Sequence, residues 1–215
     1  MKQILLMLIA VVMVGCGKKE AGKSQAQPDE KDLSTSAPKE PTQQTKPTEL
    51  TEAEKEFAET KAKAEAGEVW AQYNLGVMYT DGDGVKQDFK EAVKWYQKAA
   101  DQGDADAQVI LAFIYGTGRG VELDFKEAVK WYQKAAEQGE VQAQYNLGYH
   151  YGNGEGVPID RGVAYLWYSI AAVNGDTDAA TVKADMAKEM IPAQIAKAQE
   201  LVKEMVKKNP KLINK

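Results

Sequence analysis

Residues suited to nucleophilic, acid–base or metal chemistry are scarce in this sequence of 215 residues. It contains one histidine, His150, and one cysteine, Cys16. A catalytic site needs a nucleophile close to a base, or several metal ligands within reach of one another. These two residues provide neither, so we predict that the protein is not an enzyme and uses no cofactor and no metal ion. Carboxylates that meet between different helices are the alternative that the spacing leaves open.

Two short patterns imitate functional motifs without the structural context that those motifs need. Ser36 and Lys39 have the Ser-x-x-Lys spacing of penicillin-recognising enzymes, but they lie in a polar stretch with no predicted helix. The glycines of residues 116–120 and 152–156 are spaced like a phosphate-binding loop, which needs a preceding strand, whereas a helix is predicted there. The net charge of −5 supplies no basic surface for phosphates, so no nucleic-acid partner is predicted.

A segment with the sequence DFKEAVKWYQKAA occurs twice, beginning at Asp88 and again at Asp124. The two starts are 36 residues apart. The same spacing separates Gly67, Gly103, Gly139 and Gly175, and also Trp95, Trp131 and Trp167. A fixed period between about 20 and 50 residues indicates stacked structural repeats.

Each repeat is predicted to contain two helices joined by a glycine turn. In the first copy, Gly82 and Gly84 break the first helix, and Asp88 is the predicted N-cap of the second, with Glu91 completing a capping box. Gly103 is predicted to end the second helix in the left-handed conformation. The predicted apolar stripes are Ala71, Leu75, Met78 and Tyr79 in the first helix and Ala92, Trp95, Tyr96, Ala99 and Ala100 in the second.

The residues from Ala71 to Gly103, AQYNLGVMYTDGDGVKQDFKEAVKWYQKAADQG, resemble a Sel1-like repeat, a relative of the tetratricopeptide repeat. The resemblance extends roughly over residues 51–208. It implies an all-α fold, a right-handed α-solenoid of stacked antiparallel helix pairs in which the first helices line a concave face. The usual work of the family is to bind proteins or peptides. Stacking explains the duplicated segment, because one helix pair cannot bury its apolar stripe alone.

The two ends of the repeat array are predicted to differ from its interior. Thr51 and Glu54 form a capping box that opens a charged helix ending near Ala66. After the third repeat, residues 177–189 have the register of a first helix, and Pro192 opens a last helix. The second helix of the third repeat places Leu166, Ile170 and Val173 where the first repeat has Lys94, Lys98 and Asp101. We expect the C-terminal helices to cover this apolar surface.

The N-terminal residues resemble a secretory signal followed by a bacterial lipoprotein box. Residues 4–14 form an apolar run that is too short to span a membrane as a mature helix. Met13 to Cys16 resemble the box in which the cysteine is lipidated, and a plain secretory signal with an incidental cysteine is the alternative. Gly17 stands where an aspartate usually signals inner-membrane retention in such lipoproteins, so the resemblance implies the outer membrane. Residues 18–47 are polar throughout and are predicted to be a disordered tether.

The predicted organisation therefore has a membrane-anchoring part and a folded part. It consists of a signal peptide over residues 1–15, the lipidated Cys16 and a disordered tether over residues 16–48, a capping helix over residues 49–68, three repeats over residues 69–104, 105–140 and 141–176, and a degenerate repeat with a capping helix over residues 177–215.

Differences between the three copies indicate a candidate binding face. Ala71, Leu75 and Tyr79 have the same counterparts in every repeat, as stacking requires, whereas positions 70, 73, 74 and 77 vary and share another face of the helix. The resemblance places most of that face on the concave surface. The predicted partner-binding residues are Trp70, Tyr73, Asn74, Val77, Asp106, Val109, Phe113, Gln142, Tyr145, Asn146 and Tyr149. Large aromatic residues with polar tips are favoured interface anchors. Packing between neighbouring first helices is the alternative, above all for Tyr73, Val109 and Tyr145.

His150 aligns with Met78 and Ile114, which belong to the apolar stripes of the other copies. We therefore predict a buried structural histidine, which can also act as a pH-sensitive point in the stack.

We expect a periplasm-facing lipoprotein, held at the membrane by its lipid, that binds a protein or peptide as a scaffold, assembly factor or regulator. An immunity protein or inhibitor of an envelope-targeted toxin, as some Sel1-like lipoproteins are thought to be, is an alternative that the residues do not separate from the first. The third alternative is a β-lactam- or cell-wall-acting enzyme. Relatives associated with β-lactams carry paired cysteines in each repeat, and this chain has none.

Overall fold

The computed structural model describes residues 49–213, and the predicted signal peptide, lipidation site Cys16 and tether lie outside the described residues. Between residues 49 and 213 the chain forms nine α-helices and no β-strand. The helices are α2 (Glu52–Glu65), α3 (Val69–Asp81), α4 (Phe89–Asp101), α5 (Ala105–Thr117), α6 (Phe125–Glu137), α7 (Val141–Asn153), α8 (Arg161–Val173), α9 (Thr177–Glu189) and α10 (Pro192–Lys208). A short 3₁₀ helix, η2 (Pro210–Leu212), follows them.

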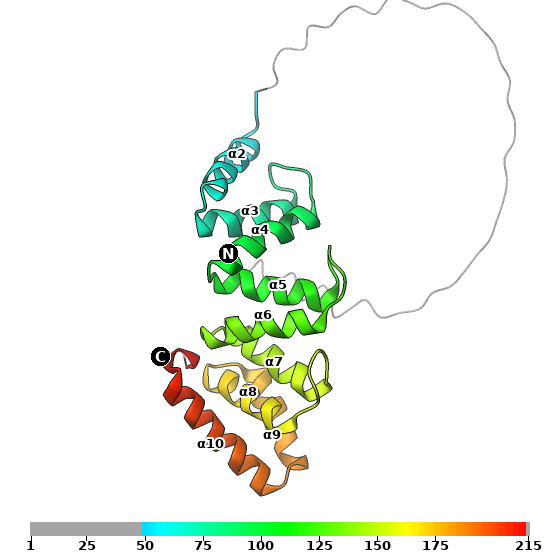
Figure 1. Cartoon of the computed structure of the whole chain (residues 1–215), viewed down its shortest axis with the longest axis vertical. Helices are drawn as coiled ribbons and strands as arrows, with labels where there is room; N and C mark the ends of the chain where they lie inside the picture. The colour runs from blue at the N-terminus through cyan, green and yellow to red at the C-terminus, as the bar shows by residue number, and fades with distance from the viewer. Residues whose placement is uncertain (1–48, 214–215) are drawn as a thin grey trace, which may run out of the picture. The chain divides into compact units, whose positions relative to one another are not determined.

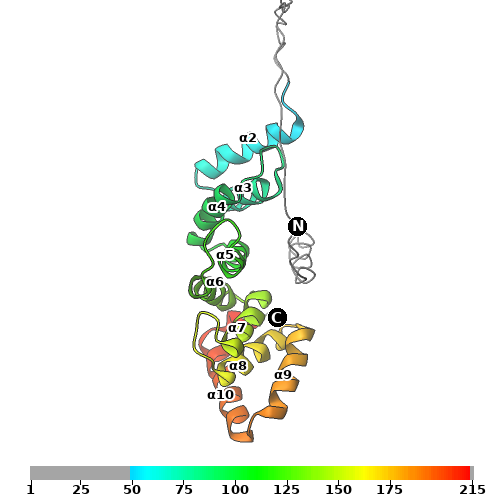
Figure 2. The same cartoon turned by 90° about the vertical axis from the view of Figure 1, so that its right-hand side faces the viewer.

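The helices stack in chain order, each packed against the helix before it and the helix after it from α2 to α9 (Figure 1). Figure 2 shows that the first helices of the pairs, α3, α5, α7 and α9, follow one another on the inner side of the curved stack. The second helices, α4, α6 and α8, lie on its outer side. The predicted all-α solenoid of antiparallel helix pairs is confirmed.

The helix ends follow from a few capping residues. Asp88 begins α4, and its carboxylate Oδ1 accepts hydrogen bonds from the backbone N–H groups of Lys90 and Glu91. The predicted capping box at this helix is wrong in its second half. The backbone N–H of Asp88 donates to the carbonyl of Tyr79 instead, and the Glu91 carboxylate pairs with Lys94. The capping box predicted for Thr51 and Glu54 at the start of α2 is present.

One glycine in each turn between first and second helices brings neighbouring repeats into backbone contact. Gly156 has a φ of +77°, and a Cβ built there would lie 2.3 Å from the carbonyl oxygen of Phe125 at the start of α6. Gly84 approaches Ala53 of α2 in the same way, at 2.1 Å. These glycines therefore serve the contact between repeats as well as the turn itself, because any side chain there would push the repeats apart.

The core consists of the stripes that the sequence predicts. Ala71, Leu75 and Met78 are buried in α3. The five predicted stripe residues of α4 are all buried, and so are their counterparts in α6. One large cluster of buried residues runs from Ala92 in α4 to Leu212 in η2, so neighbouring repeats share a core. The stripe of α3 forms a smaller cluster with Ala64 of α2 and Trp95 of α4.

A ladder of amide side chains also joins neighbouring repeats, and the sequence analysis missed it. The buried Gln72 donates from Nε2 to the carbonyl of Ala64 in the preceding helix. Its Oε1 accepts a hydrogen bond of 2.7 Å from Nε2 of Gln102, at the end of α4. Gln108 and Gln138 repeat both contacts one repeat later. The ladder keeps these amides satisfied inside the stack, where an unpaired polar group would be costly.

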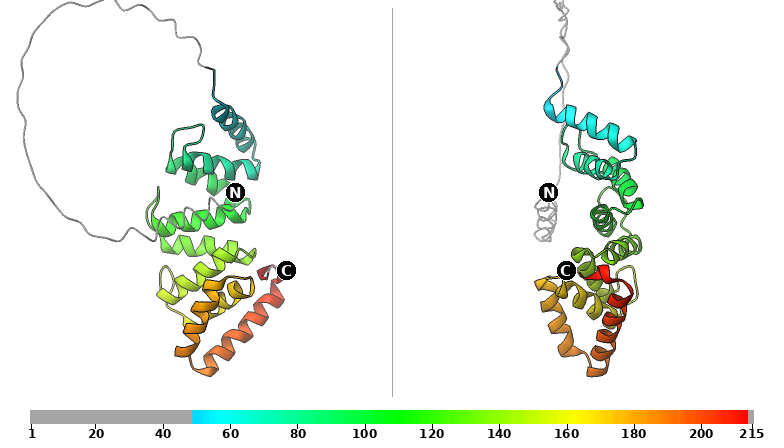
Figure 3. Two further views of the ribbon diagram at one scale, coloured as in Figure 1. Left: turned by 180° about the vertical axis from the view of Figure 1, so that it is seen from behind. Right: turned by 90° about the vertical axis from the view of Figure 1, so that its left-hand side faces the viewer.

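The C-terminal residues cover the end of the stack (Figure 3). Helix α10 packs against α8, and Leu166 and Ile170 are buried there as predicted. The prediction for Val173 is wrong, because this residue lies at the end of α8 and remains 63% exposed.

After α10 the chain folds back to α6. Asn209 donates from Nδ2 to the carbonyl of Glu137, and the side chain of Leu212 is fully buried. The Leu212 carbonyl accepts hydrogen bonds from Gln144 Nε2 at 3.0 Å and from Asn174 Nδ2 at 2.7 Å. The chain end therefore joins the amide ladder at its last step, and we call residues 209–213 the C-terminal latch.

Candidate functional site

The predicted partner-binding residues all lie on α3, α5 and α7, but they differ in how far a partner can reach them. Trp70 and Tyr149 are the most open large side chains among them, 48% and 43% exposed, and Asp106 is exposed as well. Val109 is buried in the core, so it packs within the stack, as the alternative interpretation holds. The half-buried members are Tyr73, Asn74, Val77, Phe113, Gln142, Tyr145 and Asn146.

Tyr73 and Tyr145 occupy the same position in the first and third repeats and make the same contact. The ring of Tyr73 meets that of Tyr96 edge to face, with centroids 5.9 Å apart. The ring of Tyr145 meets that of Tyr168 in the same way at 5.3 Å. Each ring therefore packs on a tyrosine from the second helix of the same repeat, and part of its surface stays open to the inner side of the stack.

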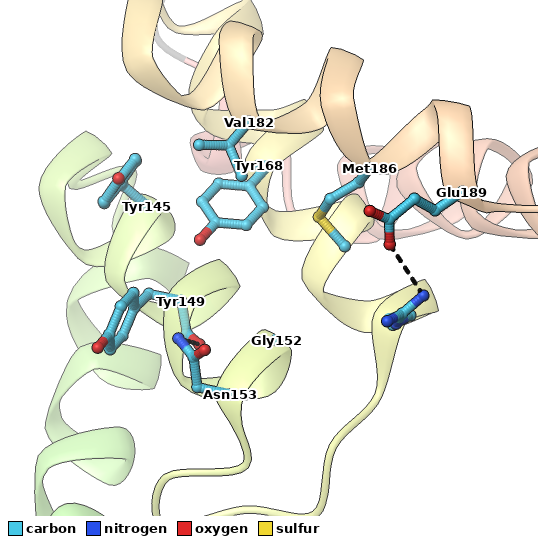
Figure 4. A pocket seen from close by; sticks show the side chains of 9 residues that line it. Tyr145, Tyr149, Gly152, Asn153, Tyr168, Val182, Met186 and Glu189 are labelled. Carbon is cyan, nitrogen blue, oxygen red and sulfur yellow. Dashed lines mark hydrogen bonds and ion pairs between the residues drawn. The ribbon is translucent and has the colours of Figure 1, made fainter.

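A hollow of about 360 Å³ lies beside Tyr145, between α7, α8 and α9 (Figure 4). We call it the α7–α9 hollow. Two predicted residues, Tyr145 and Tyr149, belong to its wall. The residues that sequence analysis missed are Gly152, Asn153, Arg161, Tyr168, Val182, Met186 and Glu189. Figure 4 shows side chains from all three helices surrounding one space. Gly152 stands where the first repeat has Thr80, but the second repeat also has a glycine there, Gly116, so this difference alone did not mark the hollow.

The polar groups of the α7–α9 hollow are tyrosine hydroxyls and one ion pair. Arg161 at the start of α8 lies 3.2 Å from the Glu189 carboxylate at the end of α9. Burial raises the pKa of Tyr168 and, to a lesser extent, that of Tyr145. The carboxylates of Asp178 and Asp176 raise the pKa of Tyr145 further. These hydroxyls are therefore protonated at neutral pH and can both donate and accept hydrogen bonds.

His150 lies behind this face, in the core between α6 and α7. It is buried, as predicted, among the rings of Phe125, Tyr132 and Tyr149. Its Nδ1 lies 3.1 Å from the carbonyl oxygen of Glu155. Burial lowers the pKa of His150 below its ordinary value, and the carbonyl and carboxylate of Glu155 oppose this only in part. The fold therefore favours the neutral imidazole.

Lowering the pH from about 7.5 to about 5.5 should reduce the free energy of unfolding through His150. The unfolded chain takes up a proton near pH 6.5, whereas the folded protein resists protonation until a lower pH, so stability is present above this range and lost below it. Urea denaturation at the two pH values measures the loss. His150→Met, which copies Met78 of the first repeat, should show a smaller loss. Equal losses in the two proteins would contradict a contribution from His150.

None of the helices within residues 49–213 has the length and apolarity needed to cross a membrane. Within the same residues, no three histidine, cysteine, aspartate or glutamate side chains are grouped so that they would hold a metal ion.

Comparisons with known proteins agree with the architecture. The family model described as "Sel1 repeat" matches residues 71–104, 105–140 and 141–176. The crystal structure of a Sel1 repeat protein from Oxalobacter formigenes superposes with a TM-score of 0.57 at 39% identity, covering 61% of this chain and 54% of that one. A protective antigen of uropathogenic Escherichia coli strains, described as displaying an SLR fold, has a TM-score of 0.65 at 33% identity. That match covers 73% of this chain and 34% of the antigen.

A putative sel1-like repeat-containing protein of Acanthamoeba polyphaga mimivirus is 48% identical over 42 residues, which are 20% of this chain and 7% of the viral protein. This chain thus spans about half or less of the length of each of these proteins. Sel1 repeats generally act as scaffolds for protein interactions rather than as enzymes. The three matched repeats and the stacked helix pairs lead to one conclusion: the chain belongs to the Sel1 repeat family.

Proposed function

We propose that this protein is a lipoprotein of the bacterial outer membrane, anchored through Cys16, that binds a protein or peptide partner on the inner face of its repeats. The anchor is proposed from the apolar run and the residues before Cys16. The binding role rests on one observation above all. The constant Ala71 and Leu75 positions are fully buried and the constant Tyr79 position is half-buried in every repeat, whereas the variable positions of the first helices include the open aromatic side chains of Trp70 and Tyr149.

The exposed aromatic side chains of the inner face are of the kinds that are common at binding surfaces. Trp70 donates a hydrogen bond from Nε1 to the Glu68 carboxylate, and the ammonium group of Lys63 lies 5.3 Å from the centre of its ring. Tyr149 borders the α7–α9 hollow. Exposed tryptophan and tyrosine contribute large contact areas at little cost in side-chain entropy, which is why they anchor many interfaces.

Replacing both Trp70 and Tyr149 with alanine should abolish partner capture while leaving the helical fold intact, because nearly half of each residue is exposed and neither belongs to the buried core. The measurement is affinity capture from crosslinked cell envelopes, followed by identification of the captured proteins by mass spectrometry. Leu123→Ala with Ile159→Ala is the matched control, because these two residues are also exposed and apolar but lie in the turns between helices.

A protein captured by the wild type and by the control, but not by the Trp70 and Tyr149 variant, would support the proposed face. Undiminished capture by that variant would refute it. Fractionation of the same cells tests the anchor, since Cys16→Ala should move the protein from the membrane fraction to the soluble fraction. A Cys16→Ala protein that stayed in the membrane fraction would refute the lipid anchor.

A further inference from the structure

The α7–α9 hollow combines the packing of α9 with a position, Gly152, that lacks the side chain of the first repeat; the second repeat has Gly116 at this position. In the first repeat, the hydroxyl of Thr80 bonds to the carbonyl of Gly76 and lies 3.3 Å from the hydroxyl of Tyr96. The equivalent of Thr80 in the third repeat is Gly152, and the equivalent of Tyr96 is Tyr168. A Cβ built on Gly152 would meet only the Cβ of Ala164, at 3.8 Å. Space for a threonine side chain is therefore open beside Tyr168.

Because Gly152 has no hydroxyl group, the hydroxyl of Tyr168 lacks the partner that Thr80 provides for Tyr96. Tyr168 is only 5% exposed, yet it lines the hollow. Among residues 49–213, no group makes a hydrogen bond to its hydroxyl, whereas the Tyr96 hydroxyl has Thr80. The hydroxyl opens into the hollow and can bond to a group of the bound partner, so the hollow favours a guest with a polar end.

The charges around the hollow favour a cationic end. The faces of Tyr145 and Tyr149 present the negative side of the aromatic quadrupole, which attracts ammonium and guanidinium groups. Asp176 and Asp178, at the start of α9, act electrostatically on Tyr145. Arg161 is the one basic residue in the wall, and the Glu189 carboxylate neutralises it. Residues 49–213 as a whole contain 27 acidic and 19 basic side chains, which adds a long-range attraction for cations.

The first repeat carries a weaker version of the same arrangement. Burial raises the pKa of Tyr73, and Asp106 and Asp104 raise it further, just as burial and then Asp178 and Asp176 raise that of Tyr145 two repeats later. There, however, Thr80 occupies the space that Gly152 leaves open, and Tyr96 has its hydrogen-bond partner. The third repeat therefore combines tyrosine faces, nearby carboxylates and an open cavity.

We propose that the α7–α9 hollow receives a lysine or arginine side chain of the protein partner. Its cationic group lies against Tyr145 and Tyr149, donates a hydrogen bond to the hydroxyl oxygen of Tyr168 and faces the carboxylates at the start of α9. This assignment rests on the proposed function, since it names the chemistry by which the inner face recognises its partner. It predicts a basic partner segment and no affinity for an acidic one.

Gly152→Thr tests the assignment, because it narrows the hollow beside Tyr168 with a side chain that the first repeat already accommodates. The probe is a fluorescent peptide of alternating lysine and glycine, with binding to the full chain measured by fluorescence anisotropy. We expect Gly152→Thr to weaken binding about tenfold, which corresponds to about 1.4 kcal/mol. Gly116→Thr, the same change in the second repeat and outside the hollow, should bind like the wild type. A Cβ on Gly116 would meet only Ala128, at 3.6 Å.

Both variants should remain folded, since threonine has a higher helix propensity than glycine, and circular dichroism checks this. They also leave the net charge unchanged, so a difference between them cannot come from general attraction of a basic peptide to an acidic protein. Equal affinity of wild type and Gly152→Thr would overturn the proposal, as would binding of a matched glutamate–glycine peptide to the wild type. Self-association that Gly152→Thr abolished would assign the hollow to a second copy and overturn it as well.

The experiment separates this inference from the proposed function. If Gly152→Thr has no effect on the peptide but the Trp70 and Tyr149 variant loses its captured partner, the inner face binds a partner without a basic anchor. If the lysine peptide binds in the hollow but no captured partner depends on Trp70 and Tyr149, the hollow binds basic segments and the proposed partner-binding face is wrong.

Discussion

Replacing Trp131 with alanine should lower the free energy of unfolding by about 3–5 kcal/mol, the largest effect that we expect for a single residue. Trp131 is buried in the middle repeat, within the cluster that runs from α4 to η2. The ring is covered by the ammonium group of Lys134, which lies 3.8 Å from its centroid. Alanine would leave a large cavity where repeats on both sides contribute to the same core. Denaturation in urea, followed by circular dichroism, measures the loss.

The loss should spread beyond α6, because interior repeats of a solenoid depend on both neighbours. Hydrogen exchange should show faster exchange of the amides in α5 and α7 as well as in α6. Trp70→Ala is the matched control, since it removes the same side chain from an exposed position on α3. A Trp131→Ala protein with a denaturation midpoint close to that of Trp70→Ala would contradict the prediction.

Replacing Leu212 with alanine should cost about 2–4 kcal/mol, although this residue lies only a few positions from the end of the sequence. Its side chain is 1% exposed and belongs to the main core. Loss of this anchor also loosens the C-terminal latch, whose Leu212 carbonyl accepts hydrogen bonds from Gln144 and Asn174. The buried amide of Gln144 would then lose one of its two acceptors.

Leu201→Ala provides the comparison for Leu212→Ala, because Leu201 lies on α10 with 37% of its surface exposed. The free energy of unfolding should change by less than about 1 kcal/mol in this variant. Urea denaturation of the two proteins gives the difference directly. Similar losses in both would show that the latch adds little to the stability of the last repeat.

The periodic features of the fold could be predicted from the sequence because they repeat. A 36-residue spacing of tryptophans and glycines is enough to place helix pairs, and the stripe residues of α4 are all buried as expected. The amide ladder has the same period, with Gln72, Gln108 and Gln144 at equal spacing. It was missed because a glutamine beside an apolar stripe usually lies at the surface, and only the structure shows the carbonyl that it reaches.

Other features depend on single departures from the period and were harder to predict. The backbone N–H of Asp88 was expected to bond to Glu91, but the turn brings the carbonyl of Tyr79 to it first. Val173 was expected to be covered, but it remains exposed at the end of α8, although the neighbouring Asn174 bonds to the Leu212 carbonyl. Two of the wall residues of the hollow, Tyr145 and Tyr149, were predicted as binding residues. The hollow itself depends on an absent side chain at Gly152 and on where α9 packs, and neither appears in a pattern of apolar residues.

The C-terminal latch also sets the order in which the protein can be completed during its synthesis. Asn209 bonds to the carbonyl of Glu137, which precedes it by 72 residues. Translation at about 5–20 residues per second therefore leaves roughly 4–14 s between the appearance of the two residues. The first two repeats can stack during this interval, whereas the apolar face of α8 waits for α10 and the Gln144 amide waits for Leu212. A nascent chain halted before Asn209 would thus leave the third repeat without the latch, more open to proteases and chaperones than the two repeats before it.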